Sequence, residues 1–441
     1  MMMNTQAFVE RVKTTKFHKY LIIALIIYTP NQIHFPSSLG LPGVNVLNVI
    51  CLMVWIIHLM SKRANDVKPQ LRRRLFIVMG FMVYAFGIAQ LRAPLNLMAD
   101  ITYVKTAIFY PLYFFLFFYV VRDEDDIRFY TLVILFVATL AAVEAIREAI
   151  NYGITRYSET RRAAGPFGPN YTAANRAGVF YSMFFPLFLS IALFYKGEKN
   201  VRRLCYAGAL LTVTAIFFTY SRQSYFIAAL CAVILLARKG PFFFFLLVLA
   251  GLNYKLWVPE AAIQRLEGTQ QVNEHGEEEL DESTESRFEL WAAGFKMMVA
   301  HPQGIGLNRF KNESGNYSIY PNKDAHNYYV LFAAEASPIA AIFHIILVIS
   351  LFVMGNKLRK LARSKGDDFG EALGRGFAMS SFAMIMGNIY GSPFFSGEVM
   401  GLYWAMAGMV VRRIQLLNQG PDDEEKETDE DPTQPVIKRA L

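Results

Sequence analysis

Apolar runs long enough to cross a lipid bilayer recur from one end of the chain to the other, and they constrain the fold more than any other feature. A helix needs about 20 predominantly apolar residues to span a hydrocarbon layer of ~30 Å. Hydrophobic residues make up 54% of the 441 residues, and the mean hydropathy is +0.28. These values are typical of a polytopic membrane protein and leave no room for a sizeable soluble domain. We therefore predict an all-α integral membrane protein.

The predicted spans number about twelve. They cover residues 18–35, 44–60, 75–91, 103–121, 129–150, 173–195, 204–220, 223–237, 241–257, 326–354, 376–391 and 397–411. Lys and Arg gather in every second loop, which is the pattern of the positive-inside rule, so both termini are predicted to be cytoplasmic. The same pattern explains the net charge of +8 without a nucleic-acid partner.

One long outer loop divides the chain. We expect transmembrane helices 1–9 within residues 1–254, the outer loop over 255–325, transmembrane helices 10–12 within 326–411 and a cytoplasmic tail over 412–441. No cleavage site follows the basic N-terminal segment, which indicates a retained anchor. The loop is net acidic through residues 274–282, interpreted as a solvated surface rather than a cation site at His275. Beyond Gln419 the composition is that of a disordered segment.

The segment from Ser283 to Pro338 carries most of the polar chemistry. Ser286 and Glu289 have the spacing of a capping box, which predicts an amphipathic helix with Arg287 in its first turn. Its apolar face is expected to consist of Phe288, Trp291, Phe295 and Met298. The helix is expected to stop at His301-Pro302, before a turn at Gly304-Ile-Gly306 and the sequence Ala325-His326-Asn327 that opens the next apolar run.

Several cations are predicted to meet on the outer face. Arg222 lies in a tight turn between two spans, Arg287 begins the loop helix and His326 opens a span. The GPFGPN turn before the sixth span is surrounded by Arg161, Arg162, Gly165, Asn170 and Arg176. Guanidinium groups bind phosphate oxygens bidentately at any relevant pH, so two or three aimed at one point would hold a diphosphate. His326, with an ordinary pKa of ~6.5, suits a general base.

Each of these residues also has a structural interpretation. An arginine at a membrane rim can extend to the headgroups or pair with an acid, and an interfacial histidine can serve only as a hydrogen-bonding group. Glu335, in an otherwise apolar run, is either functional or satisfied by an internal partner such as an arginine. Glu144, Arg147 and Glu148 are spaced to pair along one helix and are interpreted as structural.

Three stretches together resemble the O-antigen ligase and Wzy-type polymerase superfamily of bacterial envelope enzymes. They are SRQSY at 221–225, SRFELWAAGFKMMVAHPQGIGLNRF at 286–310 and AHNYYVLFAAEASPIA at 325–340. The turn AAGPFGPNYTAAN at 163–175 is similar to the family's, with Gly-Pro-Asn where Asn-Pro-Asn is common. Glu335-Ala-Ser stands where the family usually has Glu-x-Gly. The resemblance covers the second half of the chain.

The resemblance implies an inverting, metal-independent glycosyl transfer at the periplasmic face of the bacterial inner membrane, with no cofactor. An undecaprenyl-diphosphate-linked glycan would be the donor, and a hydroxyl of lipid A-core or of another glycan the acceptor. Arg222 and Arg287 would neutralise the diphosphate and His326 would accept the acceptor's proton. The resemblance and the outer-face charges together suggest as substrate-binding residues Arg161, Arg162, Asn170, Arg176, Asn327 and Glu335.

Ligase and polymerase share this chemistry and differ in their acceptor, so both remain open. The acidic loop slightly disfavours an acceptor rich in phosphate. A third hypothesis is a transporter of lipid-linked oligosaccharides. Transporters usually carry charges near the membrane midplane and show internal repeats, whereas the informative charges here lie at one face and no repeat of 20–50 residues is apparent. The absence of a glycine-rich phosphate loop argues separately against a nucleotide-driven pump.

Overall fold

A computed structural model describes most of the chain. The described residues are 5–36, 39–40, 44–60, 67–154, 158, 160–168, 171–256, 258–267, 270–272, 278–280 and 282–419. Asn170, His275 and the tail from residue 420 onward, all of which the sequence singled out, lie outside these ranges.

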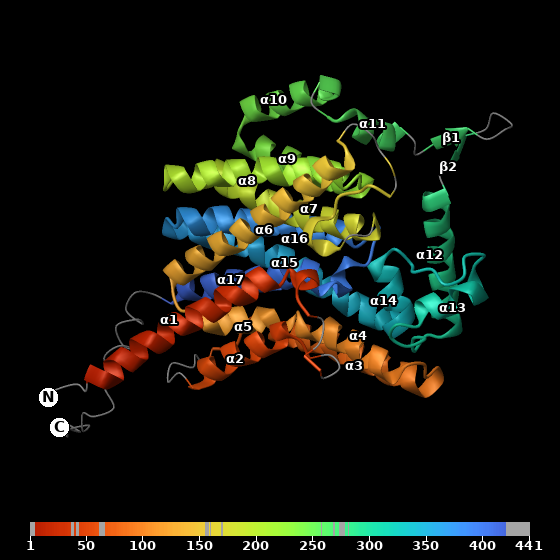
Figure 1. Ribbon diagram of the computed structural model, residues 1–441, viewed down its shortest axis with the longest axis horizontal. Coiled ribbons are helices and arrows are strands. Elements are labelled where there is room, and N and C mark those ends of the chain that lie inside the picture. Colours follow the sequence, from red (N-terminus) through yellow and green to blue (C-terminus); the bar gives the residue numbers. More distant parts are fainter. Residues whose placement is uncertain are drawn as a thin grey trace.

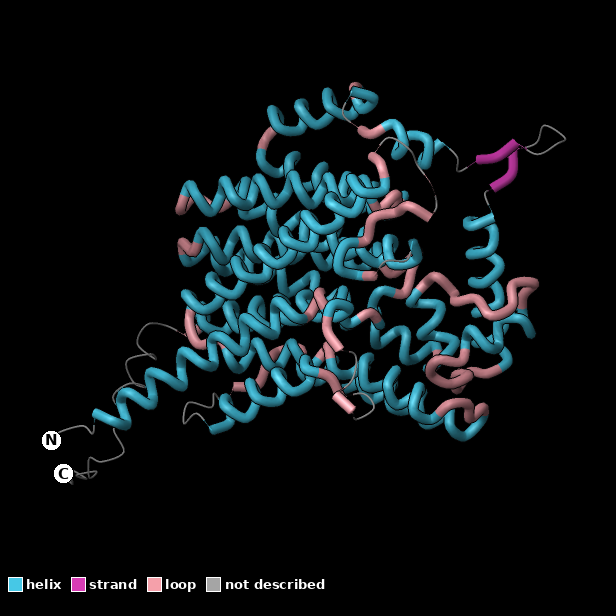
Figure 2. Tube along the Cα trace, in the orientation of Figure 1, coloured by secondary structure: helices cyan, strands magenta, loops and turns pink. Residues whose placement is uncertain are grey.

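The described part is a bundle of long helices with a smaller helical lobe at one end (Figure 1). The lobe consists of α12 (Glu282–Ala300), α13 (Phe310–Tyr317) and α14 (Tyr328–Ala336). Apart from one short hairpin, the regular elements described are helices (Figure 2). This agrees with the predicted all-α class.

The bundle is built from the remaining long helices. They are α1 (Thr5–Tyr28), α2 (Val46–Met60), α3 (Arg72–Arg92), α4 (Leu97–Phe109), α5 (Leu112–Val120), α6 (Glu124–Tyr152), α7 (Tyr171–Phe194), α8 (Lys199–Phe218), α9 (Arg222–Lys239), α10 (Pro241–Leu252), α15 (Pro338–Lys365), α16 (Asp368–Gly387) and α17 (Gly397–Asn418). The smaller elements are α11 (Glu260–Glu267), the antiparallel strands β1 (Gln270–Val272) and β2 (Glu278–Leu280), and the 3-10 turns η1 (Gln32–His34), η2 (Gly165–Phe167), η3 (Tyr254–Leu256) and η4 (Pro393–Phe395).

Six helical segments of the described chain are long and apolar enough to cross a membrane. They are Arg72–Arg92, Leu97–Val120, Glu124–Tyr152, Ala173–Phe194, Lys199–Phe218 and Pro338–Lys365. The chain is therefore a multi-pass membrane protein. Every other predicted span overlaps a helix, and two of these helices, α2 and α10, are apolar but shorter. Crossing by these other helices remains a prediction.

Burial separates the central helices from the peripheral ones. In the most apolar stretch of α7, 94% of the residues are buried within the protein, whereas the corresponding share in α3 is 28%. α7 packs against α8, α9 and α16, whereas α10 contributes no buried residue. A helix that is apolar all round lies either in a core or against lipid, and these two groups represent the two cases.

Ion pairs gather at the end of the bundle away from the lobe. Arg413 of α17 contacts both Glu124 at 2.5 Å and Asp367 at 2.6 Å. Lys196 and Asp368 pair at the same end, which joins the loops before α8 and α16. Loops that the sequence assigned to one side of the membrane therefore lie together, as the alternation of Lys and Arg predicted. The side that faces the cytoplasm remains a prediction.

The prediction of one continuous helix over 326–354 is wrong. The helix breaks at Ser337, which has φ +133° and ψ +158°, between the end of α14 at Ala336 and the start of α15 at Pro338. Proline has no N–H and disfavours helical geometry in the residue before it, so the break follows from the local sequence. His326 and Glu335 consequently belong to the lobe and not to a membrane span.

Candidate active site

The long helix of the lobe starts earlier than the capping-box pattern predicts. α12 begins at Glu282, so Ser286 is not its N-cap and Arg287 lies in its second turn. The predicted stop is confirmed, because the helix ends at Ala300, immediately before His301 and Pro302. Arg287 therefore lies inside the helix, more than one turn after its start.

The predicted apolar face of α12 is also partly wrong. Phe288 and Phe295 are 48% and 59% exposed. The buried stripe consists of Leu290, Ala293, Gly294 and Met297. A Cβ on Gly294 would come within 2.3 Å of the Val330 side chain, so α12 lies very close to α14 along this stripe. The small residues Ala293 and Gly294 allow α14 to lie close, so this face of α12 is the buried one although these two residues are less hydrophobic than Phe288 and Phe295.

α12 is tied to the segment that carries His326. The indole Nε1 of Trp291 donates to the carbonyl oxygen of Ala325 at 3.0 Å. The Trp291 ring also lies 5.6 Å from that of Tyr390, and the Arg287 guanidinium lies 6.0 Å from the same tyrosine ring. Arg287, Trp291 and Tyr390 thus form one surface beside His326.

The backbone around His326 is fixed from two sides. His326 has φ +48°, a left-handed conformation that is uncommon for a residue with a side chain. Two residues later, the N–H of Tyr328 donates to the carbonyl oxygens of Asn388 at 2.9 Å and Gly391 at 3.0 Å. The Asn327 side chain caps α14 by accepting from the N–H groups of Tyr329 and Val330. The amide oxygen of Asn327 is thereby engaged within the protein.

The imidazole of His326 is held towards its neutral form. Crowding by neighbouring atoms lowers the pKa of His326, although the residue keeps an exposed surface. Asp324 opposes this shift, while the positive charges of Arg287 and Lys323 add to it. A pKa below the usual value leaves the ring able to accept a proton at neutral pH.

Arg222 lies on the same rim of the bundle. It is the first residue of α9 and is half-buried. The adjacent Gln223 side chain donates to the carbonyl oxygens of Met386 at 2.9 Å and Gly387 at 2.8 Å, at the end of α16. The next residue, Asn388, accepts from Tyr328. A short series of hydrogen bonds therefore connects the turn of Arg222 with the segment of His326.

The arginines near the GPFGPN turn differ from one another. Arg162 is buried, donating from Nε to the Thr219 carbonyl oxygen at 2.8 Å and from its guanidinium to Asn175 at 2.6 Å. Arg176 pairs with Glu398 of α17 at 3.0 Å. Arg161 is exposed. Arg162 thus ties the end of α8 to α7, and Arg161 and Arg176 offer more of their surface to a ligand.

Glu144 and Glu148 are structural, but through partners other than those predicted. One Glu148 oxygen accepts from the N–H groups of Ala164 and Gly165, both at 2.8 Å, and so caps η2. Glu144 lies 3.2 Å from a ring nitrogen of His34. Both contacts are long-range, so helical spacing alone does not reveal them.

Comparison with known protein families adds to this geometry. Residues 207–336 match the O-antigen ligase family. The match extends from α8 to the end of α14 and includes Arg222, Arg287, His326 and Glu335, which confirms the resemblance and supports glycan transfer of ligase or polymerase type. No curated protein matches the chain.

A buried ion pair that the sequence reasoning missed joins the matched segment to α4. Arg309 and Asp100 are 1% and 3% exposed, and the guanidinium meets both carboxylate oxygens, at 2.8 and 2.5 Å. Gln90 donates to the same carboxylate at 2.8 Å. Asp100 lies in α4, far outside the matched segment, and only its position at the edge of an apolar run signals it in the sequence.

The Glu335 side chain binds the backbone of the segment that carries Arg309. Its Oε1 accepts from the N–H groups of Arg309 and Phe310, both at 2.9 Å, at the start of α13. Burial raises the pKa of the Glu335 carboxyl to about 7, although these N–H donors lower it. The internal partner of Glu335 is therefore a helix N-terminus and not the expected guanidinium group.

Two glycines allow this loop to approach its neighbours. Gly304 and Gly306 have φ of +91° and +104°. A Cβ on Gly304 would lie 2.4 Å from the Glu335 carbonyl oxygen, and one on Gly306 would lie 2.5 Å from Cα of Ala89 in α3. The turn in the family-like GIG sequence is thus wedged between α3 and α14.

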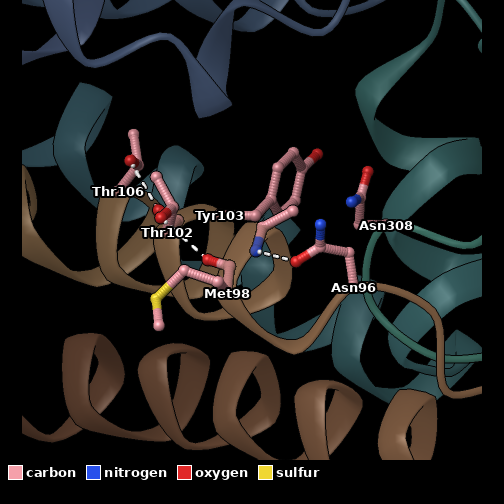
Figure 3. A pocket seen from close by; sticks show the side chains of 7 residues that line it. Asn96, Met98, Thr102, Tyr103, Thr106 and Asn308 are labelled. Carbon is pink, nitrogen blue, oxygen red and sulfur yellow. Dashed lines mark hydrogen bonds between the residues drawn. The ribbon is translucent and has the colours of Figure 1, made fainter. Parts of the chain in front are cut away.

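An open hollow of about 550 Å³ lies beside α4 (Figure 3). Asn308, which lines it, donates to the Asp100 carboxylate at 3.4 Å, so the hollow adjoins the ion pair of Asp100 and Arg309. It is lined by Asn96, Met98, Ala99, Thr102, Tyr103, Thr106 and Asn308. The Tyr103 ring lies 5.2 Å from that of Phe395, which lies 4.9 Å from that of Tyr328. Aromatic contacts therefore connect the wall of the hollow with the start of α14.

Proposed function

We propose that the chain is an inverting glycosyltransferase that moves a glycan from undecaprenyl diphosphate to an acceptor hydroxyl at the periplasmic face of the bacterial inner membrane. The observation that carries this proposal is the contact between α12 and α14. Trp291, one turn after Arg287 in α12, binds the carbonyl oxygen of Ala325, the residue before His326, and all of these residues lie in the matched segment. A permanent cation beside a proton acceptor is the pair that displacement of a diphosphate requires.

The reaction is a direct displacement. The acceptor oxygen attacks the anomeric carbon on the face opposite the diphosphate, so the new C–O bond forms as the bond to the diphosphate breaks. His326 takes the proton of the acceptor hydroxyl, and its lowered pKa keeps the ring unprotonated at neutral pH. The products are the glycosylated acceptor and undecaprenyl diphosphate, with inverted configuration.

Arg287 and Arg222 are assigned to the leaving diphosphate. The bidentate geometry of guanidinium matches two phosphate oxygens, and its charge stabilises the negative charge that develops there. A diphosphate is already a good leaving group, so no nucleotide and no metal is assigned to the reaction. Both arginines belong to the matched segment.

The remaining predicted binding residues divide into two groups. Arg161 and Arg176 stand at the same rim with exposed surface, and we assign them to the phosphate or the glycan of the donor. Arg162, Asn327 and Glu335 bond mainly to the protein itself, so we assign them supporting roles. Asn170 keeps its assignment from the sequence.

The membrane orientation is part of the proposal. The lobe and the 255–325 loop face the periplasm, and the end that carries Arg413 faces the cytoplasm together with both termini. α17 continues to Asn418, so the predicted boundary of the tail at residue 412 falls inside this helix. The positive-inside distribution supports this orientation. Transmembrane helices 1–9 then fall within residues 1–254, and helices 10–12 correspond to α15, α16 and α17, which begin at Pro338 and end at Asn418 rather than covering the predicted 326–411.

Ligase activity with lipid A-core as acceptor is the first candidate, and polymerisation of lipid-linked repeats is the alternative. Purified protein in liposomes would receive the undecaprenyl-diphosphate-linked glycan with and without lipid A-core. Release of undecaprenyl diphosphate only with lipid A-core is expected for a ligase, whereas release with donor alone and longer chains indicates a polymerase. No release in either case, with glycan transferred across the bilayer, would favour the transporter hypothesis.

A further inference from the structure

The ion pair of Asp100 and Arg309 and the carboxyl of Glu335 form one buried cluster, here called the clamp. Their exposed fractions are 3%, 1% and 1%. Burying a charged group costs free energy because its bound water is lost, and hydrogen bonds and opposite charges within the protein must offset that cost. They do so only when their geometry is good. The guanidinium satisfies this condition with two bonds to the carboxylate and a third from Nε to the Ala93 carbonyl oxygen at 2.7 Å.

The clamp joins three parts of the molecule. Asp100 belongs to α4 of the bundle, Arg309 belongs to the connection from α12 to α13, and Glu335 lies in the last turn of α14. Two backbone bonds run beside it, from Ile305 to the Ala334 oxygen at 2.9 Å and from Gly306 to the Glu335 oxygen at 3.0 Å. The connection after α12 is therefore attached both to the bundle and to α14.

α14 is consequently held at both of its ends by the α12–α13 part of the lobe. At its start, Trp291 of α12 binds Ala325, next to His326. At its end, Glu335 binds the N-terminus of α13. Loss of the Glu335 contact would leave the end of α14 bound to the α12–α13 connection only through the backbone bonds of Ile305 and Gly306. α14 could then shift against α12, and the His326 ring would shift relative to Arg287.

We propose that Asp100, Arg309 and Glu335 are positioning residues that fix the relative placement of Arg287 and His326. This inference rests on the proposed function for its effect on catalysis. Its structural part does not depend on that function. The clamp contacts neither reacting group, so it acts through the orientation of α12 and α14 alone.

The test compares Asp100→Asn with a matched control at the other end of the bundle. Asp367→Asn breaks a similar buried pair, since Arg413 donates from Nε to Asp367 at 2.7 Å. We expect D100N to lower kcat per folded protein about 10- to 100-fold with KM for the donor within about threefold, because a misplacement of ~1 Å costs about that much. D367N is expected to lower thermal stability while kcat stays within about twofold.

Hydrogen exchange measured by mass spectrometry tests the structural part directly. We expect amides of residues 301–317 and 326–336 to exchange at least about tenfold faster in D100N, while D367N leaves these peptides unchanged. If D100N does not fold, Arg309→Lys replaces it, because lysine keeps the charge and loses the two-point contact. Unchanged exchange, or an equal loss of kcat in D100N and D367N, would overturn the proposal.

Substitutions of Glu335 separate positioning from chemistry. Glu335→Gln keeps an oxygen that can accept from Arg309 and Phe310, and is expected to retain kcat within about threefold, whereas Glu335→Met should resemble D100N. Equal inactivation by both, with normal exchange in Glu335→Gln, would show a chemical role and refute positioning. If the wild-type protein transfers no glycan, the proposed function fails, and the exchange result still decides whether the clamp holds the lobe.

Discussion

Ser337 occupies a backbone conformation that suits glycine, and replacing it with glycine is expected to stabilise the protein. Its φ of +133° with ψ of +158° falls in a region that is essentially restricted to glycine, at a cost of about 1–3 kcal/mol for other residues. The sequence resemblance points to the same position, since the family usually has glycine there. Ser337→Gly tests whether the break between α14 and α15 is strained.

The expected change in the free energy of unfolding of Ser337→Gly is the sum of one stabilising effect and two destabilising effects. Relief of strain contributes about 2 kcal/mol. Loss of the Ser337 hydroxyl, which accepts from the N–H of Ala340 at 3.2 Å, costs a few tenths of a kcal/mol. The greater freedom of glycine in the unfolded chain costs about 0.4–1 kcal/mol. The net result is a stabilisation of about 1 kcal/mol, or a rise in Tm of about 1–3 °C for a chain of this size.

The buried thiols of Cys51, Cys205 and Cys231 provide the assay. A thiol-reactive dye added to protein in detergent reports unfolding when these groups become accessible. Ser337→Ala is the control, because it keeps the strained φ and loses the hydroxyl cap, and is expected to destabilise by about 0.5–2 kcal/mol. A Tm for Ser337→Gly at or below that of Ser337→Ala would refute the reasoning.

Three further predictions concern the site. Arg222→Lys is expected to lower kcat at least about tenfold despite the retained charge, because lysine lacks the two-point contact with phosphate; near-normal release of undecaprenyl diphosphate would argue against the diphosphate role. Asp324→Asn removes a charge that raises the pKa of His326, so the acidic limb of the pH–rate profile is expected to move to lower pH, and a shift to higher pH would contradict the general-base assignment. Gly306→Ala would bring a Cβ within 2.5 Å of the Ala89 backbone at φ +104°, and is expected to destabilise by about 2–4 kcal/mol in the dye assay; a Tm equal to wild type would show that the turn is not wedged against α3.

Local sequence signals located most of the elements correctly. Most apolar runs coincide with helices, His301-Pro302 ends α12, and the loops before α6, α8 and α16, which the sequence assigned to one side, lie together at one end of the bundle. These features depend on hydrophobicity, proline and charge, which act over a few residues. The start of α12 was misplaced by five residues, from Arg287 to Glu282, because a capping-box pattern also occurs inside helices.

The contacts that organise the site were not predictable in this way. Asp100 and Arg309 are more than 200 positions apart, and neither stands out locally. Glu335 was recognised as a buried acid in need of a partner, but the partner is a backbone N-terminus that only the folded loop creates. Gly294 determines which face of α12 is buried because α14 lies against it.

The sequence by itself therefore determined a multi-pass helical membrane protein and the resemblance to O-antigen ligases, and it singled out Arg222, Arg287 and His326 as candidates. Only the tertiary structure decided how these residues are held: α12 against α14 through Trp291, and both against α4 through Arg309. The physical reason is that hydrophobicity and helix signals are properties of neighbouring residues. Hydrogen bonds between distant segments form only when the chain has packed.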